Sequence, residues 1–124
     1  MKPVCEVMVT QILPAIRALV ARKLVEKHGF SQKAAAEKLG TSQPAISQYS
    51  REIRGYKNHI IKSDPKIMEM IDIIAERVSR GELSQEMLTM EFCNICRYMR
   101  SSGMLCEIHR KLYPSLEKCT ICIE

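Results

Sequence analysis

The stretch that decides the fold, residues 31–49, reads SQKAAAEKLGTSQPAISQY. Ala35 or Ala36 is small enough to let two helices cross closely, and Gly40 can supply the positive φ of a tight turn. The core between the two helices also needs apolar residues, and Leu39 and Ile46 are placed to provide them. These three requirements are met together at the right spacing. The stretch therefore predicts a helix-turn-helix motif.

The remaining chain is also predicted to be helical, because apolar residues recur every three or four positions and no alternating strand of useful length occurs. We therefore expect an all-α fold with a helix-turn-helix domain at 1–62 and a small cysteine-rich helical domain at 63–124. The linker is expected near Ser63-Asp64-Pro65. The expected helices, bounded by caps and glycines, run from about 4–12, 14–27, 31–39, 43–51, 67–80, 85–101 and 106–112.

Positive charge is concentrated in the first part of the chain. Residues 1–57 hold ten Lys or Arg against four Glu, a net charge of +6, whereas residues 58–124 hold nine against ten acidic residues, a net charge of −1. A basic region of this kind is where a polyanion would bind. Aromatic residues make up only 5% of the chain, which argues against a protein that binds single strands by stacking bases.

Residues 12–57 resemble the XRE-type helix-turn-helix family of the lambda and 434 repressors. A narrower resemblance, to predicted archaeal regulators with C-terminal cysteines, rests on PVCEVM at 3–8, ILPAIR at 12–17 and AISQY at 45–49, followed by Arg54-Gly55. The resemblance implies a lambda repressor-like domain that binds double-stranded DNA and regulates transcription.

In such a domain the helix that begins at Gln43 lies in the major groove, where Gln side chains suit adenine because an amide both donates and accepts hydrogen bonds. Gln43, Ser47 and Gln48 are the expected base contacts. Arg51 and Arg54 are expected on phosphates, with Arg51 also a candidate base contact. The full set of expected DNA-binding residues is Gln32, Lys33, Thr41, Ser42, Gln43, Pro44, Ser47, Gln48, Arg51 and Arg54.

The C-terminal half contains two CxxC pairs and a fifth cysteine between them. Two such pairs can supply four thiolates to one zinc ion or iron-sulfur cluster, so four of the five are the expected ligands. Spacing alone does not say which four, and His109 is a further candidate ligand. Cys5, which stands apart, is expected to be a core thiol. The five cysteines are Cys93, Cys96, Cys106, Cys119 and Cys122.

Both zinc and an iron-sulfur cluster accept four thiolates, so chemistry leaves the two nearly even. The resemblance to archaeal regulators favours a 4Fe-4S cluster slightly, and a cluster could sense redox or iron and sulfur status. We expect the cysteine-rich domain to lack the aliphatic core needed to hold its shape without the metal. We also expect a homodimer on a palindromic site, formed through an apolar stripe that consists of Ile67, Ile71, Ile74 and Val78.

Two other functions remain open at this point. One is a regulator with purely structural zinc, and the other is a redox protein that uses CxxC as a dithiol, although no βαβ unit is visible to carry such a site. No catalytic triad, phosphate loop or paired-carboxylate site is evident, so we expect a protein that is not an enzyme. With no signal-peptide pattern and no long apolar run, we expect it to be cytoplasmic and without membrane contact.

Overall fold

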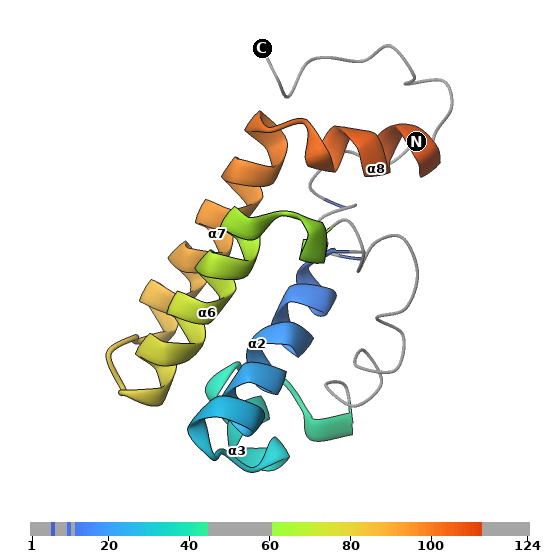
Figure 1. The fold of residues 1–124 in the computed structure, drawn as a ribbon. Coiled ribbons are helices and arrows are strands. Elements are labelled where there is room, and N and C mark those ends of the chain that lie inside the picture. The colour runs from blue at the N-terminus through green and yellow to red at the C-terminus, as the bar shows by residue number, and fades with distance from the viewer. Residues whose placement is uncertain (1–5, 7–9, 11, 45–60, 113–124) are drawn as a thin grey trace.

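The computed structural model describes Glu6, Thr10 and residues 12–44 and 61–112, and every structural statement concerns these residues. They contain helices and no strand, which confirms the all-α prediction (Figure 1). The expected helices at 4–12 and 43–51 lie largely outside the described residues. The helices are α2 (Leu13–His28), α3 (Gln32–Lys38), α6 (Pro65–Ser79), α7 (Gln85–Ser101) and α8 (Met104–Leu112).

Several predicted helix boundaries are confirmed by their caps. The Ser31 hydroxyl accepts a hydrogen bond from the Ala34 amide at 3.0 Å, and the Ser84 hydroxyl accepts one from Met87 at 3.2 Å. Gly29 ends α2 with a φ of 73°, a left-handed conformation that favours glycine. These caps arise because the first amides of a helix need acceptors that the helix itself cannot supply.

Helix α6 begins within the stretch at 63–65 where the linker was expected. Asp64 is its N-cap, and its Oδ1 accepts hydrogen bonds from the amides of Lys66 at 2.9 Å and Ile67 at 3.2 Å. Pro65 follows as the first helical residue, where the missing N–H costs nothing. The helix expected after this stretch therefore begins at Pro65, and a linker between two domains here stays a prediction. The last described helix, α8, also begins two residues earlier than expected, at Met104.

Helix α2 is the central helix of the described structure. It packs against α3 and α6, and Figure 1 shows it beside α6 with α3 at its C-terminal end. Three alanines, Ala15, Ala18 and Ala21, are buried along it and let neighbouring helices approach closely. Leu24 near its end is fully buried. Because α2 is covered on several sides, it is the fixed helix against which the motif helix α3 packs.

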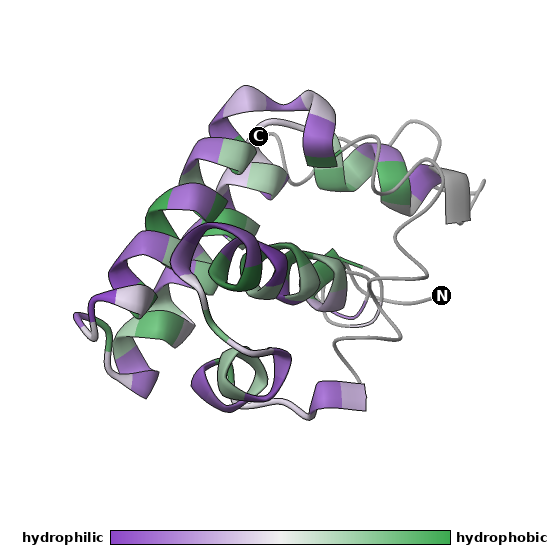
Figure 2. Cartoon of the chain, turned by 60° about the horizontal axis from the view of Figure 1, so that its bottom comes forward, coloured by the Kyte–Doolittle hydropathy of each residue, from purple (hydrophilic) through white to green (hydrophobic). Residues whose placement is uncertain are grey.

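The apolar stripe of α6 is buried inside the chain and does not form a surface for a second copy. Its four members pack in the core that α2 also enters, with exposed fractions of 0, 0, 1 and 5% for Ile67, Ile71, Ile74 and Val78. This corrects the expected dimer surface, and the reason is tertiary: α2 supplies the apolar partner that the stripe required. Figure 2 shows hydrophobic residues on the sides where the helices meet.

The cysteine-rich half does contribute aliphatic side chains to a core, but it shares that core with α2, so its ability to hold its shape alone stays untested. Helices α7 and α8 bury six large apolar side chains in the same cluster as α2. These are Leu88, Phe92, Ile95, Met99, Leu105 and Ile108. The buried residues on either side of position 62 therefore belong to one cluster, while independent folding of 1–62 and 63–124 remains a prediction.

Candidate nucleic-acid interface and cysteine site

The turn after α3 is built from backbone hydrogen bonds that only a glycine accommodates easily. Gly40 has a φ of 67°, and its amide donates to the Glu37 carbonyl at 3.2 Å. The next amide, from Thr41, donates back to Ala36 at 3.0 Å. This pair of bonds is the Schellman arrangement, which ends a helix and redirects the chain. The redirected chain is helical again at Gln43 and Pro44.

The turn places the first residues of both motif helices side by side. The Gln43 Nε2 donates to the Gln32 Oε1 at 3.4 Å, although the two residues are eleven apart in sequence. Lys33 is exposed beside Gln32. Of the other expected DNA-binding residues, Ser42 and Pro44 are exposed and Thr41 is partly exposed. The remaining four lie outside the described residues: Ser47, Gln48, Arg51 and Arg54.

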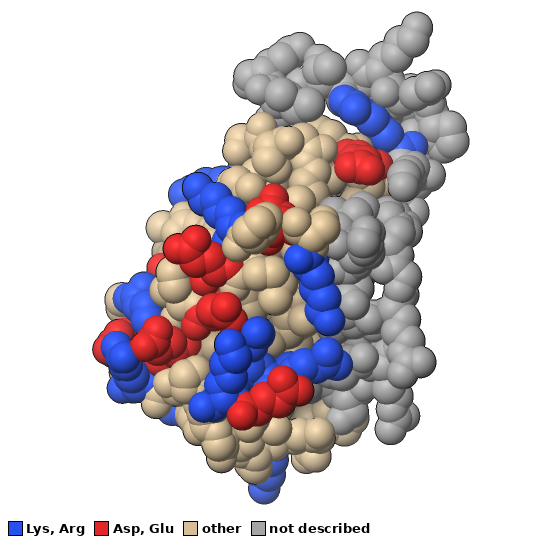
Figure 3. Space-filling view, viewed as in Figure 1, with Lys and Arg blue, Asp and Glu red and all other residues tan. Residues whose placement is uncertain are grey.

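Several charged side chains of α6, of α7 and of the turn between them form ion pairs. The Arg77 Nη1 lies 3.3 Å from the Glu91 Oε1, and an Arg80 nitrogen lies 2.6 Å from the Glu76 Oε1. Figure 3 shows acidic and basic side chains interspersed on the face it presents. A mixed surface of this kind does not attract a polyanion strongly. The charged residues of α6 and α7 are mixed in sign and show no positive excess like that of residues 1–57.

Residues 22–54 match the model of a protein family whose description is Helix-turn-helix. These residues are thus similar to a helix-turn-helix domain. The match begins within α2, covers all of α3 and the turn at Gly40, and continues beyond Pro44. The match spans about a quarter of the chain, so it concerns this domain alone. Residues 55–124 lie outside the match. No curated protein and no solved structure matches the chain.

The helix-turn-helix domain is held to the C-terminal helices by side-chain contacts as well as by the core. The Lys23 ammonium on α2 lies 3.3 Å from the Asp72 Oδ1 on α6. The Arg17 guanidinium lies over the Phe92 ring on α7, 5.9 Å from its centroid. A cation near a ring face is attracted by the electron density of the ring. Through Asp72 and Phe92, both α6 and α7 contact the scaffold helix of the domain.

The described cysteines separate into one pair and one core thiol. Cys93 is exposed and Cys96 is half-buried on α7, whereas Cys106 on α8 is only 3% exposed. Among the described residues, no three His, Cys, Asp or Glu side chains are grouped so that they could hold a metal ion. Cys93, Cys96 and Cys106 therefore do not form a three-thiol group in the part of the chain that the structure describes. The side chain of His109 and the cysteines at 5, 119 and 122 lie outside the described residues.

This arrangement fits a site built from the two CxxC pairs. Cys93 and Cys96 are three residues apart on one helix, so both thiols lie on the same side of α7. Two thiolates cannot complete the coordination of zinc or of a cluster, which needs four. The second pair, Cys119 and Cys122, has the required chemistry and number.

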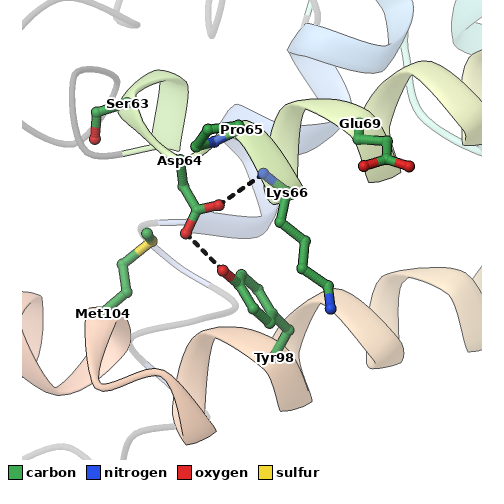
Figure 4. Close-up of a pocket in the computed structure, with 7 residues that line it drawn as sticks. All are labelled: Ser63, Asp64, Pro65, Lys66, Glu69, Tyr98 and Met104. Carbon is green, nitrogen blue, oxygen red and sulfur yellow. Dashed lines mark hydrogen bonds between the residues drawn. The ribbon is translucent and has the colours of Figure 1, made fainter.

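A shallow pocket lies where the start of α6 meets the end of α7 (Figure 4). The Tyr98 hydroxyl donates to the Asp64 Oδ2 at 2.8 Å, while the other carboxylate oxygen caps α6. The Lys66 ammonium lies 5.1 Å from the centroid of the Tyr98 ring. The hydrogen bond with Asp64 is the largest cause that raises the pKa of Tyr98 above its ordinary value. Desolvation and the negative charge of Asp64 raise this pKa further. The residues of this pocket thus join the two helices.

Replacing Tyr98 with phenylalanine should destabilise the protein at neutral pH and have little effect in strong alkali. Because the pKa is raised in the folded state, the stabilisation is fully present below the pKa of the unfolded chain, near 10. It is lost as pH rises through the folded-state pKa, when phenolate and carboxylate repel each other. Urea unfolding of both proteins at neutral pH and above a pH of about 11 measures the difference. An equal difference at both pH values would contradict this account.

A polar contact that the sequence did not predict joins the two halves of the chain. The Gln85 Nε2 at the start of α7 donates to the carbonyl oxygen of Lys38 at the end of α3, at 3.3 Å. The two residues are 47 apart in sequence, and no local pattern predicts such a tertiary bond.

Proposed function

We propose that this chain is a sequence-specific DNA-binding transcription regulator. The observation that carries the proposal is the helix-turn-helix domain at 22–54, in which Gly40 brings the starts of two helices together. Exposed polar side chains gather at this junction, as expected where a protein surface meets the edges of bases and the phosphates beside them. The proposed partner is double-stranded DNA.

In this proposal the helix from Gln43 enters the major groove. Gln43, Ser47 and Gln48 contact base edges, while Gln32 and Lys33 contact the phosphate backbone next to the groove. Thr41, Ser42 and Pro44 border the same surface. Arg51 and Arg54 add positive charge for further phosphates, in line with the net charge of +6 over residues 1–57.

Affinity for duplex DNA should fall steeply with salt, because each neutralised phosphate releases counterions. Gln48→Ala should reduce the preference for the best site by roughly one to two orders of magnitude, the value of one good base contact, and change non-specific binding little. Lys33→Ala is the matched control, since it should weaken specific and non-specific binding alike. Fluorescence anisotropy with both kinds of duplex measures these effects. A Gln48→Ala protein that keeps its sequence preference would exclude the proposed base contact.

We also propose that two copies bind one palindromic operator. A single recognition helix covers only a few base pairs, so useful specificity normally requires two half-sites. The stripe of α6 is buried and cannot supply the contact between copies. Ile73, Met87 and Met90 are the exposed large apolar side chains on the described helices, and they are the candidates in its place. Analytical ultracentrifugation of the DNA complex gives the number of chains per duplex.

For the cysteines, we propose that Cys93, Cys96, Cys119 and Cys122 hold a 4Fe-4S cluster. The burial of Cys106, which is only 3% exposed, supports this choice of four from the five thiols. A cluster would let the regulator respond to redox state or to iron and sulfur supply, because oxidation breaks it down. Elemental analysis of protein purified without oxygen tests the proposal. Brown protein with iron and sulfide supports it, and colourless protein with zinc supports a structural site.

A further inference from the structure

We propose that Gln85 is a positioning residue, through which α7 holds the turn of the helix-turn-helix domain. This inference rests on the proposed DNA-binding function for its consequence. The hydrogen bond itself lies within the described structure, between the Gln85 amide and the Lys38 carbonyl. It is a direct polar link from the helix that carries Cys93 and Cys96 to the end of α3.

The carbonyls at the end of α3 explain why this contact matters. The last carbonyls of a helix have no partner within it. Three of them, from Ala35, Ala36 and Glu37, accept the amides of Leu39, Thr41 and Gly40. The next carbonyl in order, that of Lys38, accepts the Gln85 amide. Gln85 thus continues the series of bonds that ends α3 and shapes the turn.

The position of Gly40 provides a second link. A Cβ atom added at Gly40 would lie 3.7 Å from the Gln85 Oε1, so the amide of Gln85 lies against this glycine as well as against Lys38. Gly40 is the residue whose left-handed backbone redirects the chain toward Gln43. A shift of α7 would therefore move the group that fixes the start of the second motif helix.

The packing of α7 makes it able to transmit such a shift. Ser84 caps its first turn, while Phe92 and Ile95 anchor its middle in the core. Cys93 and Cys96 lie on the same helical segment, two to three turns after Gln85. An α-helix moves largely as a rigid rod, because each turn is bonded to the next. Changes at the cysteine pair can thus reach the turn through a single element.

Gln85→Glu tests the proposal because it separates two effects. Glutamate has nearly the same shape but cannot donate to a carbonyl, and it places negative charge against the C-terminal end of α3. At the first helical position of α7, however, a negative charge favours the helix. If Gln85 served α7 alone, the variant would be as stable as the natural protein or more so. Gln85→Arg restores a long donor and should restore the contact.

Hydrogen exchange of the amides of Gly40 and Thr41 gives the readout without DNA. In Gln85→Glu, both should exchange roughly two- to tenfold faster, the value of one lost hydrogen bond, while Met87 is unchanged. Thr89→Ala is the matched control, since Thr89 is also exposed on α7 and its hydroxyl bonds only within that helix, to the Gln85 carbonyl at 2.9 Å. Unchanged exchange at Gly40 and Thr41 in Gln85→Glu would overturn the proposal.

The second readout is binding to the preferred duplex and to a random one. Affinity for the preferred duplex should fall roughly two- to tenfold in Gln85→Glu and recover in Gln85→Arg. In the control Thr89→Ala, non-specific binding should be unchanged. If the natural protein binds no DNA, the proposed function fails, yet the exchange measurement still decides whether Gln85 holds the turn. Faster exchange with unchanged preference among duplexes would show that the turn does not control recognition.

Discussion

Replacing Ile71 with alanine should lower the free energy of unfolding by about 2–5 kcal/mol. Ile71 lies on α6 with no exposed surface, in the core cluster that α2, α3, α7 and α8 share. Removing three carbons from a filled core loses the transfer free energy of those groups and leaves a cavity. Urea unfolding followed by circular dichroism measures the loss. One cooperative transition at lower urea is the expected result, because both halves of the chain contribute to this cluster.

Ile73→Ala is the matched control, only two residues away on the same helix. Its side chain is 44% exposed, so its removal should change stability by no more than about 0.5 kcal/mol. If Ile71→Ala were equally mild, α6 would not pack on α2 as described. If only part of the helical signal were lost at low urea, the two halves would unfold separately, as expected for independent domains at 1–62 and 63–124.

The second large effect is expected at the cysteines. Cys119→Ser should remove the metal or cluster completely, because a serine hydroxyl is a poor substitute for a thiolate ligand. Metal binding contributes about 10 kcal/mol or more in small thiolate sites, so the metal-free variant should lose most of its resistance to unfolding in the segment after Leu112, which carries Cys119 and Cys122. Helix α7 should remain helical, since Leu88, Phe92 and Ile95 bury it in the core without the metal.

Cys106→Ala provides the control within the same half of the chain. Cys106 is part of α8 and only 3% exposed, so its replacement should cost some stability but leave the metal content unchanged. Cys5→Ser should likewise spare the metal. Iron, sulfide and zinc analysis of the purified variants decides the matter. Loss of metal in Cys106→Ala, or full metal content in Cys119→Ser, would refute the proposed set of ligands.

Local chemistry made much of the fold predictable. The caps at Ser31 and Ser84 and the left-handed glycines at 29 and 40 follow from short-range rules, and each lies where the sequence indicated. Asp64 follows the same short-range rules, because its carboxylate caps the first amides of α6. The Asp-Pro pair alone does not show which apolar partner Ile67 and Ile71 pack against, and that depends on the assembled core.

The candidate DNA-binding site was also predictable only in part, because short-range rules place residues of one motif but not contacts between distant helices. Gly40 and the exposed Gln32 and Gln43 follow from the spacing of one motif. The burial of the α6 stripe does not, because amphipathic periodicity shows that a face is apolar but not which partner covers it. Gln85 was missed because its partner is 47 residues away. Polar contacts across such distances depend on the assembled fold.

The central claim is sequence-specific DNA recognition by the helix-turn-helix domain, and selection from a pool of random duplexes tests it most directly. The protein, purified without oxygen with its metal retained, is mixed with the pool at low salt, and the bound duplexes are sequenced over several rounds. We expect enrichment of one motif with two inverted half-sites about 10 base pairs apart, centre to centre. Failure to retain duplex DNA at low salt, or retention without any enriched sequence, would contradict the account.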